Sequence, residues 1–156
     1  MWGQSGHGQR AQLPVTLNDR EVVLAPRTDQ SQPAFTACSL DDNPGRGDPA
    51  DGDPKGQVNL YLFWETRDVV DQADRWEMTV GLVNKAPQDS CTVCITPRRL
   101  QKLKPQPGEK FRWTNTPSGA EKPSQSGQLA ADEHGLVTLP KVQVSKQKNR
   151  LAIYSP

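Results

Sequence analysis

The stretch that decides the fold is WEMTVGL, residues 76–82, in which Trp76, Met78, Val80 and Leu82 alternate with polar or small residues. A period of two is typical of a β-strand that turns one face to a core and the other to water. The same alternation recurs in shorter stretches, with proline and glycine between them and no helical stripe. This pattern predicts an all-β protein, an antiparallel β-sandwich of about seven to nine strands.

Further strands are predicted at 15–17, 21–24, 34–40, 58–65, 91–96, 110–115, 125–130, 135–144 (interrupted at Pro140) and 150–154. Segment 58–65 is apolar on both faces, which predicts a central strand whose second face is covered. The large apolar residues that are in phase along these strands form the predicted core: Leu60, Leu62, Trp76, Met78, Val80, Leu82, Val93, Ile95, Phe111, Trp113, Leu136, Leu151 and Ile153.

A chain of 156 residues suits one domain with a core of its own. Residues 1–13, rich in glycine and glutamine, are expected to be a flexible lead. Residues 14–156 are expected to form a single β-sandwich domain with an irregular loop at 41–57. The 14 prolines, the 12 glycines and a mean hydropathy of -0.76 agree with many turns and one solvated sheet face.

Charge and hydropathy limit the expected partners and location. The net charge is +1, so we expect no nucleic-acid partner. No run approaches the roughly 18 apolar residues of a membrane span, so none is expected. The first ten residues lack the apolar centre of a signal peptide. We therefore expect this chain to be a piece of a longer extracellular or periplasmic protein.

The three cysteines make an odd count, which excludes a complete disulfide framework. Cys91 and Cys94 have CxxC spacing, but the residues around them predict a strand, where positions three apart face opposite ways. They are therefore expected to share neither a metal nor a redox site. We expect Cys91 in the core and Cys94 on a face or at an edge. A disulfide from Cys38 to either of them is the alternative in an oxidising compartment.

The loop at 41–57 is the most acidic segment, and calcium is one interpretation of it, since calcium prefers oxygen ligands. EF-hand spacing fails, because counting from Asp51 places Lys55 at a ligand position and Leu62 where a glutamate belongs. We expect a solvated acidic loop with at most weak calcium binding and no other cofactor. An adhesion module that acts through Arg46-Gly47-Asp48 is an alternative function. The candidate calcium ligands are Asp41, Asp42, Asp48, Asp51 and Asp53.

Residues 96–104 carry a basic patch made of Arg98, Arg99, Lys102 and Lys104. Such a patch can bind phosphate, nucleic acid or an acidic polysaccharide. Acidic residues elsewhere balance it, so we interpret it as the solvated end of a strand before a turn at Pro105. Its arginines are expected to pair with the acidic loop or with Asp68, Asp71 and Asp74.

Trp64 and Tyr61 are the candidate ligand-binding residues, because sugar rings stack on exposed aromatic faces. They occupy opposite faces of one predicted strand, so at least one of them faces away from the main core. No catalytic constellation appears in the sequence, so we expect no enzyme. The alternative is a fragment of a hydrolase that uses the carboxylates of Asp68, Asp71 and Asp74.

From Trp76 to Tyr154 the chain resembles a fibronectin type III-like β-sandwich module of the kind appended to large bacterial secreted hydrolases. The resemblance is carried by WEMTV at 76–80, CTV at 91–93, TPRR at 96–99, PGEKFRWTN at 107–115, GLVT at 135–138 and NRL at 149–151. It implies a non-catalytic accessory module that binds carbohydrate or positions a catalytic domain. The implied partners are a polysaccharide or an attached catalytic domain, and the resemblance speaks to fold more than to function.

Overall fold

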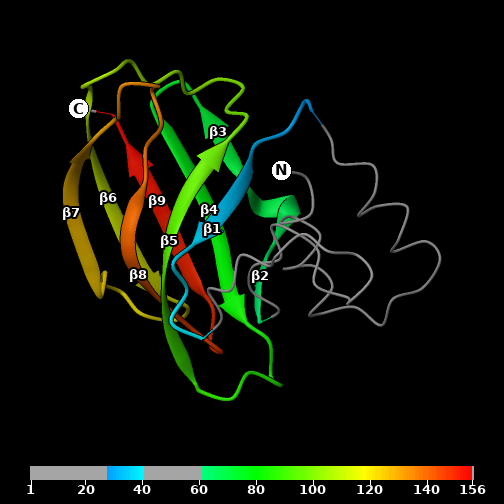
Figure 1. The fold of residues 1–156 in the computed structure, drawn as a ribbon. Helices are drawn as coiled ribbons and strands as arrows, with labels where there is room; N and C mark the ends of the chain where they lie inside the picture. The colour runs from blue at the N-terminus through cyan, green and yellow to red at the C-terminus, as the bar shows by residue number, and fades with distance from the viewer. Residues whose placement is uncertain (1–27, 41–60, 156) are drawn as a thin grey trace.

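Two antiparallel sheets face each other in the computed structural model, which describes residues 28–40 and 61–155 (Figure 1). The smaller sheet has the order β1 (Gln32–Thr36), β5 (Ser90–Arg98), β8 (Leu139–Ser145). The larger has the order β2 (Leu62–Trp64), β4 (Arg75–Leu82), β9 (Asn149–Tyr154), β6 (Lys110–Pro117), β7 (Gln125–Ala130), and β3 (Val70–Gln72) also pairs with β4. The predicted all-β antiparallel sandwich is confirmed.

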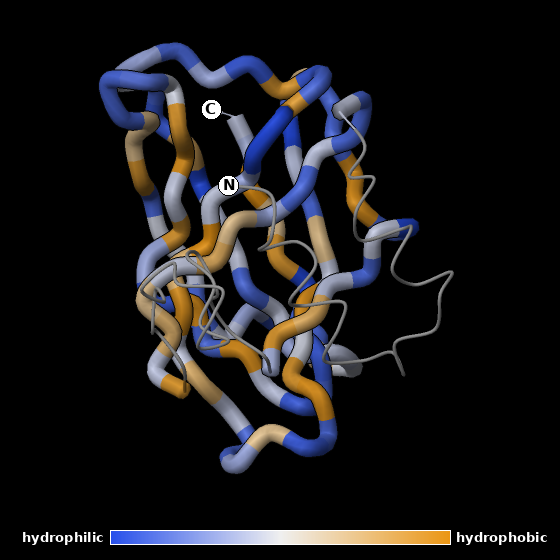
Figure 2. The backbone as a smooth tube through the Cα atoms, turned by 45° about the vertical axis from the view of Figure 1, so that its right-hand side comes forward, coloured by the Kyte–Doolittle hydropathy of each residue, from blue (hydrophilic) through white to orange (hydrophobic). Residues whose placement is uncertain are grey.

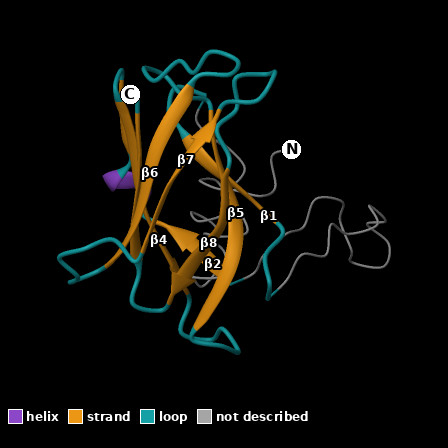
Figure 3. Ribbon diagram, turned by 90° about the vertical axis from the view of Figure 1, so that its left-hand side faces the viewer, coloured by secondary structure: helices purple, strands orange, loops and turns teal. Residues whose placement is uncertain are grey.

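The last strand, β9, lies inside the larger sheet between β4 and β6. In immunoglobulin-type sandwiches the last strand lies at a sheet edge. A short 3-10 helix, η2 (Thr66–Asp68), joins β2 to β3 and lies on the outer side of the larger sheet (Figure 3). No helix among the described residues is long and apolar enough to cross a membrane.

The core lies between the two sheets and is formed by the inward positions of the alternation. Figure 2 shows apolar residues recurring between polar ones along the backbone. β4 shows this most clearly, since Trp76, Met78, Val80 and Leu82 are all buried. The predicted core residues of β5, β6 and β9 are also buried. Leu60 lies outside the described residues. The alternation therefore predicted which side of each of these strands faces the core.

Leu136 is a correction to the predicted core, because it is only half-buried. The predicted strand at 135–144 begins later, at Leu139, since a turn at 132–136 precedes it. Val137, at 1% exposure, and Leu139 occupy the core instead. The prediction was wrong here because Leu136 belongs to a hydrogen-bonded turn, so the alternation of a paired strand does not determine where its side chain points.

β2 is a second correction. The segment at 58–65 was predicted to be a central strand, yet among the described strands β2 pairs only with β4 and ends the order of the larger sheet. Its outward residue, Phe63, is nevertheless 4% exposed. The Phe63 ring lies where a Cβ on Gly81 would be 2.8 Å away, and Lys148 Nζ is 5.7 Å from the ring centre. The Phe63 ring therefore packs over Gly81 and close to the Lys148 side chain.

Several predictions lie outside the described residues. They are the flexible lead at 1–13, the strands at 15–17 and 21–24, and the irregular loop at 41–57 with its candidate calcium ligands and Arg46-Gly47-Asp48. β3, only three residues long, was not predicted. Three residues are too few for a period of two to stand out from chance.

Candidate functional site

The outer face of the larger sheet carries the polar members of the alternation. Strand register places Arg75, Tyr154, Arg112 and Gln128 side by side, in that order, across β4, β9, β6 and β7. The next row contains Glu77, Ala152, Thr114 and Ser126. Two arginines therefore flank one tyrosine on a solvated sheet face.

An open groove of about 520 Å³ lies over β6, β7 and the end of β9. Its side-chain lining comes from outward positions on these strands: Arg112, Thr114, Ser126, Gln128 and Tyr154. Trp113 and Gly127 complete the lining. A Cβ on Gly127 would lie 2.9 Å from Trp113 Nε1, so only glycine fits there without moving the indole. Ala152 and Thr114 are cross-strand partners, so small side chains lie beside the Tyr154 row.

The lining combines one aromatic ring with groups that exchange hydrogen bonds. Tyr154 is half-buried, so its ring is held by neighbours while part of it meets solvent. Thr114, Ser126 and Gln128 supply hydroxyl and amide donors and acceptors. Arg112 is exposed, and among the described residues no carboxylate forms an ion pair with it. The groove therefore suits a polyhydroxylated ligand and tolerates a negative charge on it.

The sequence did not single out Tyr154, Arg112 or Gln128 as a site. The alternation of β9 contains the signal for one of them, because Leu151 and Ile153 point inward and so Tyr154 points outward. The neighbours of Tyr154 depend on strand order, which no local pattern reports. Residues 112, 128 and 154 meet only because β9 pairs with β6 and β6 with β7.

The two aromatic residues singled out from the sequence lie elsewhere. Trp64 is 4% exposed, and its ring centre is 5.8 Å from that of Phe35 on the opposite sheet. It faces the core and offers no exposed platform. Tyr61 is half-buried against the edge of the core. Neither residue lines the groove over β6 and β7.

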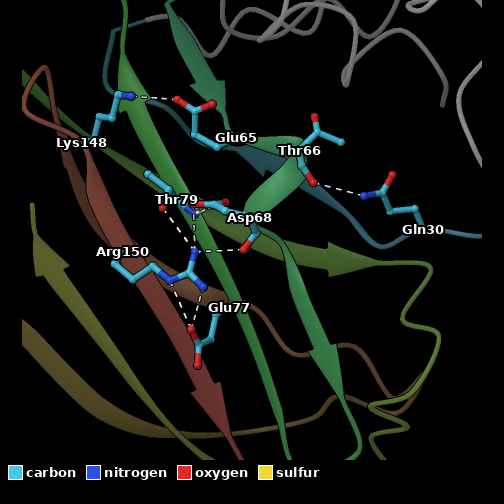
Figure 4. A network of polar contacts seen from close by, with 8 residues as sticks. All are labelled: Gln30, Glu65, Thr66, Asp68, Glu77, Thr79, Lys148 and Arg150. Atoms are coloured by element: carbon cyan, nitrogen blue, oxygen red, sulfur yellow. Dashed lines mark hydrogen bonds and ion pairs between the residues drawn. The ribbon is translucent and has the colours of Figure 1, made fainter.

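Of the three aspartates proposed for a hydrolase, Asp68 and Asp71 use their carboxylates in structural contacts, and Asp74 contributes a backbone carbonyl. Asp68 forms an ion pair with Arg150 at 3.0 Å, and Arg150 also contacts Glu77 at 2.7 Å (Figure 4). Asp71 accepts hydrogen bonds from the backbone amides of residues 101–103, at 3.0 Å from Leu103 N. Asp74 is exposed, and its backbone carbonyl accepts a bond from Ser155. The carboxylates of Asp68 and Asp71 therefore have structural partners in this fold.

The basic patch follows the end of β5, as expected for the solvated end of a strand. Arg98, Lys102 and Lys104 are exposed and Arg99 is half-buried. Lys104 Nζ donates to the Leu100 carbonyl at 2.6 Å, so part of the positive charge stabilises its own loop. Asp71 is an acidic partner of this segment through its backbone amides. The predicted pairing of the arginines with the loop at 41–57 lies outside the described residues.

The cysteines lie as the strand pattern predicted. Cys91 is 4% exposed and faces the core, whereas Cys94 is half-buried on the other face of β5. The two thiols therefore lie on opposite faces of β5, as predicted. Within the described residues, no three histidine, cysteine or acidic side chains are grouped so that they could hold a metal ion. Comparisons with protein-family models, curated proteins and solved structures find no match to this chain.

Proposed function

We propose that the protein is a non-catalytic carbohydrate-binding module that holds a sugar chain in the groove over β6, β7 and β9. The observation that carries this proposal is the groove itself: an open, shallow surface with one half-buried tyrosine among hydroxyl, amide and guanidinium groups. Sugar rings offer C–H groups to an aromatic face and hydroxyls to polar neighbours. Tyr154 would take the ring, and Gln128, Ser126 and Thr114 its hydroxyls.

Arg112 adds a preference to this proposal. A solvated guanidinium without an ion-pair partner among the described residues can bind a carboxylate with two parallel hydrogen bonds. A glycan that carries uronic acids would therefore bind more tightly than a neutral one of the same shape. We further propose that this module is attached to the catalytic domain of a secreted bacterial hydrolase. This part of the proposal rests on the resemblance over residues 76–154.

The test is binding of the purified chain to a panel of polysaccharides, neutral (cellulose, chitin, starch) and acidic (polygalacturonate, alginate), followed by calorimetry on any that retain it. Tyr154→Ala is expected to weaken binding about fivefold, because one stacked ring contributes about 1 kcal/mol. Gln128→Ala, at an exposed position, is expected to weaken binding with no change in the melting temperature. Arg112→Gln is expected to weaken the binding of acidic glycans and to leave the binding of neutral glycans unchanged.

Tyr61→Ala is the matched control, since it removes a half-buried tyrosine outside the groove. Binding lost in Tyr61→Ala but kept in Tyr154→Ala would move the site to β2. Failure to bind every glycan would contradict the binding function and favour a role in positioning a catalytic domain. Hydrolysis of any substrate by the isolated chain would overturn the non-catalytic assignment.

A further inference from the structure

Cys38 lies just beyond β1, where the pairing of β1 with β5 changes register. The regular ladder ends at the pair Thr36 and Cys94. Ala37 then has a φ of 51°, in the left-handed region that non-glycine residues rarely adopt. Beyond it, Ser39 N donates to the Thr92 carbonyl at 2.9 Å, and Thr92 N donates to Ser39 Oγ at 3.0 Å. The contact of Ser39 with Thr92 is shifted by one residue relative to the ladder.

This shift decides which way Cys38 faces. In an uninterrupted strand, Cys38 would share the outer face with Thr36, which is exposed, because side chains alternate. The extra residue at Ala37 reverses the alternation, as a β-bulge does. Ala37 is therefore exposed, and Cys38 is 2% exposed and belongs to the core. Cys91 belongs to the same core at 4% exposure, whereas Cys94 points to the other face of β5.

The two buried thiols lie close enough to interact directly. The side chain of Cys38 is within hydrogen-bonding reach of the Cys91 thiol, and this contact, together with burial, raises the pKa of Cys91. The raised pKa keeps Cys91 as an unreactive thiol while the native structure stays closed.

We propose that Cys38 and Cys91 form a disulfide that ties the chain after β1 to β5. One S–S bond forms as the two thiols lose two protons and two electrons, and a small-molecule disulfide accepts them and leaves as two thiols. Exchange takes place during folding or when residues 37–40 open, because the closed core holds few thiolates. The bond joins the residues just after β1, an outer strand of the smaller sheet among the described residues, to β5, its middle strand.

The bond is also expected to stabilise the fold. It closes a loop that contains residues 39–90, and long closed loops restrict the unfolded chain most. The oxidised protein is expected to melt about 10 °C above the reduced protein, from the entropy of closing a loop of that length. An oxidising compartment would supply the disulfide oxidant, although the inference does not depend on the proposed glycan function.

Non-reducing peptide mapping of the full chain, refolded in a glutathione redox buffer, tests this inference. Trypsin leaves Cys91 and Cys94 in one peptide, residues 86–98, so the matched variants Cys94→Ser and Cys91→Ser identify the linked sulfur. We expect the cross-link to residue 38 and the higher melting temperature in the wild type and in Cys94→Ser. Neither is expected in Cys91→Ser.

Two outcomes would overturn the proposal. One is a cross-link from Cys38 that survives in Cys91→Ser and disappears in Cys94→Ser. The other is a refolded wild type in which alkylation after denaturation labels all three cysteines. The linkage is read from the wild type and from Cys94→Ser, whose half-buried position tolerates serine, so the test does not depend on the folding of Cys91→Ser.

Discussion

Asp132 shows how one carboxylate sets the start of a strand. Its Oδ1 accepts hydrogen bonds from the backbone amides of His134 and Leu136, both at 2.8 Å. Gly135 closes the same turn with a φ of +71°, and a Cβ there would lie 2.8 Å from the Pro105 carbonyl oxygen. The bond from the Leu136 amide, then that from His134, holds the pKa of Asp132 below its ordinary value, helped by the positive charges of His134 and Arg98.

The lowered pKa predicts a dependence of stability on pH. The charged form of Asp132 favours the native state, so its contribution is full above the unfolded-state pKa of 3.8 and is lost as the pH falls through the lower folded-state pKa. Asp132→Asn is expected to lower the melting temperature at pH 7, with a difference from wild type that narrows below about pH 4. Thermal melts from neutral to acidic pH measure this. Glu133→Gln, at an exposed neighbour, should show no such narrowing.

Among the elements, η2 is attached to the larger sheet chiefly through Arg150 of β9. The Arg150 guanidinium donates to the Asp68 carbonyl at 3.0 Å and to Thr79 Oγ1 at 3.3 Å (Figure 4). It also forms ion pairs with the carboxylates of Asp68 and Glu77. Strands β4 and β9 are thus joined to η2 by one side chain. A fork of donors suits this position, because a single ammonium could not reach all of these acceptors at once.

Arg150→Met keeps an unbranched apolar stem and removes these bonds. It is expected to lower the free energy of unfolding by about 1–3 kcal/mol, because the Glu77 carboxylate, whose side chain is 17% exposed, loses its closest partner. Urea unfolding measures the change. Lys148→Met is the control, since its ion pair with Glu65 is more exposed, and it should cost about 0.5 kcal/mol or less. Equal losses in both variants would contradict the role given to Arg150.

At the scale of the whole molecule, side-chain amides join the two sheets at one end of the sandwich. Gln125 of β7 donates to the Lys141 carbonyl at 3.2 Å and accepts from Gln143 N at 2.8 Å, both on β8. Asn115 of β6, fully buried, donates to the Gln143 carbonyl and to Gln125 Oε1, each at 2.8 Å. β8 is the last strand of the smaller sheet. These amides therefore satisfy backbone groups that an edge strand leaves unpaired.

Gln125→Ala tests this connection between the sheets. It removes the partner of the exposed Gln143 amide and one of the two bonds that buried Asn115 donates, so we expect a loss of about 1 kcal/mol in the free energy of unfolding. Because it also frees the edge of β8, size-exclusion chromatography should detect more association than in the wild type. Gln128→Ala, on the outward face of the same strand, is the control and should change neither measurement.

Much of this fold could be read from local sequence because the pleat of a strand imposes a period of two wherever one face is buried. That period identified the inward residues of β4, β5, β6 and β9 and placed Cys91 and Cys94 on opposite faces. It was wrong at Leu136, where a turn replaces the strand. It also placed the strand at 58–65 centrally, because an apolar face that packs close to the Lys148 side chain resembles one covered by a second layer of protein.

The sequence by itself determined the fold class and the inward face of most strands, since both follow from local alternation. Only the tertiary structure decided which strands are neighbours, because pairing depends on hydrogen bonds between segments far apart in the chain. The groove needs β9 beside β6, which brings Tyr154 next to Arg112. Likewise, the left-handed conformation at Ala37 turns Cys38 toward Cys91 and away from the face of Cys94. One residue in a left-handed conformation shifts the alternation, so every side chain after it in the strand points to the opposite face. A prediction that assumes regular strands cannot detect such a residue.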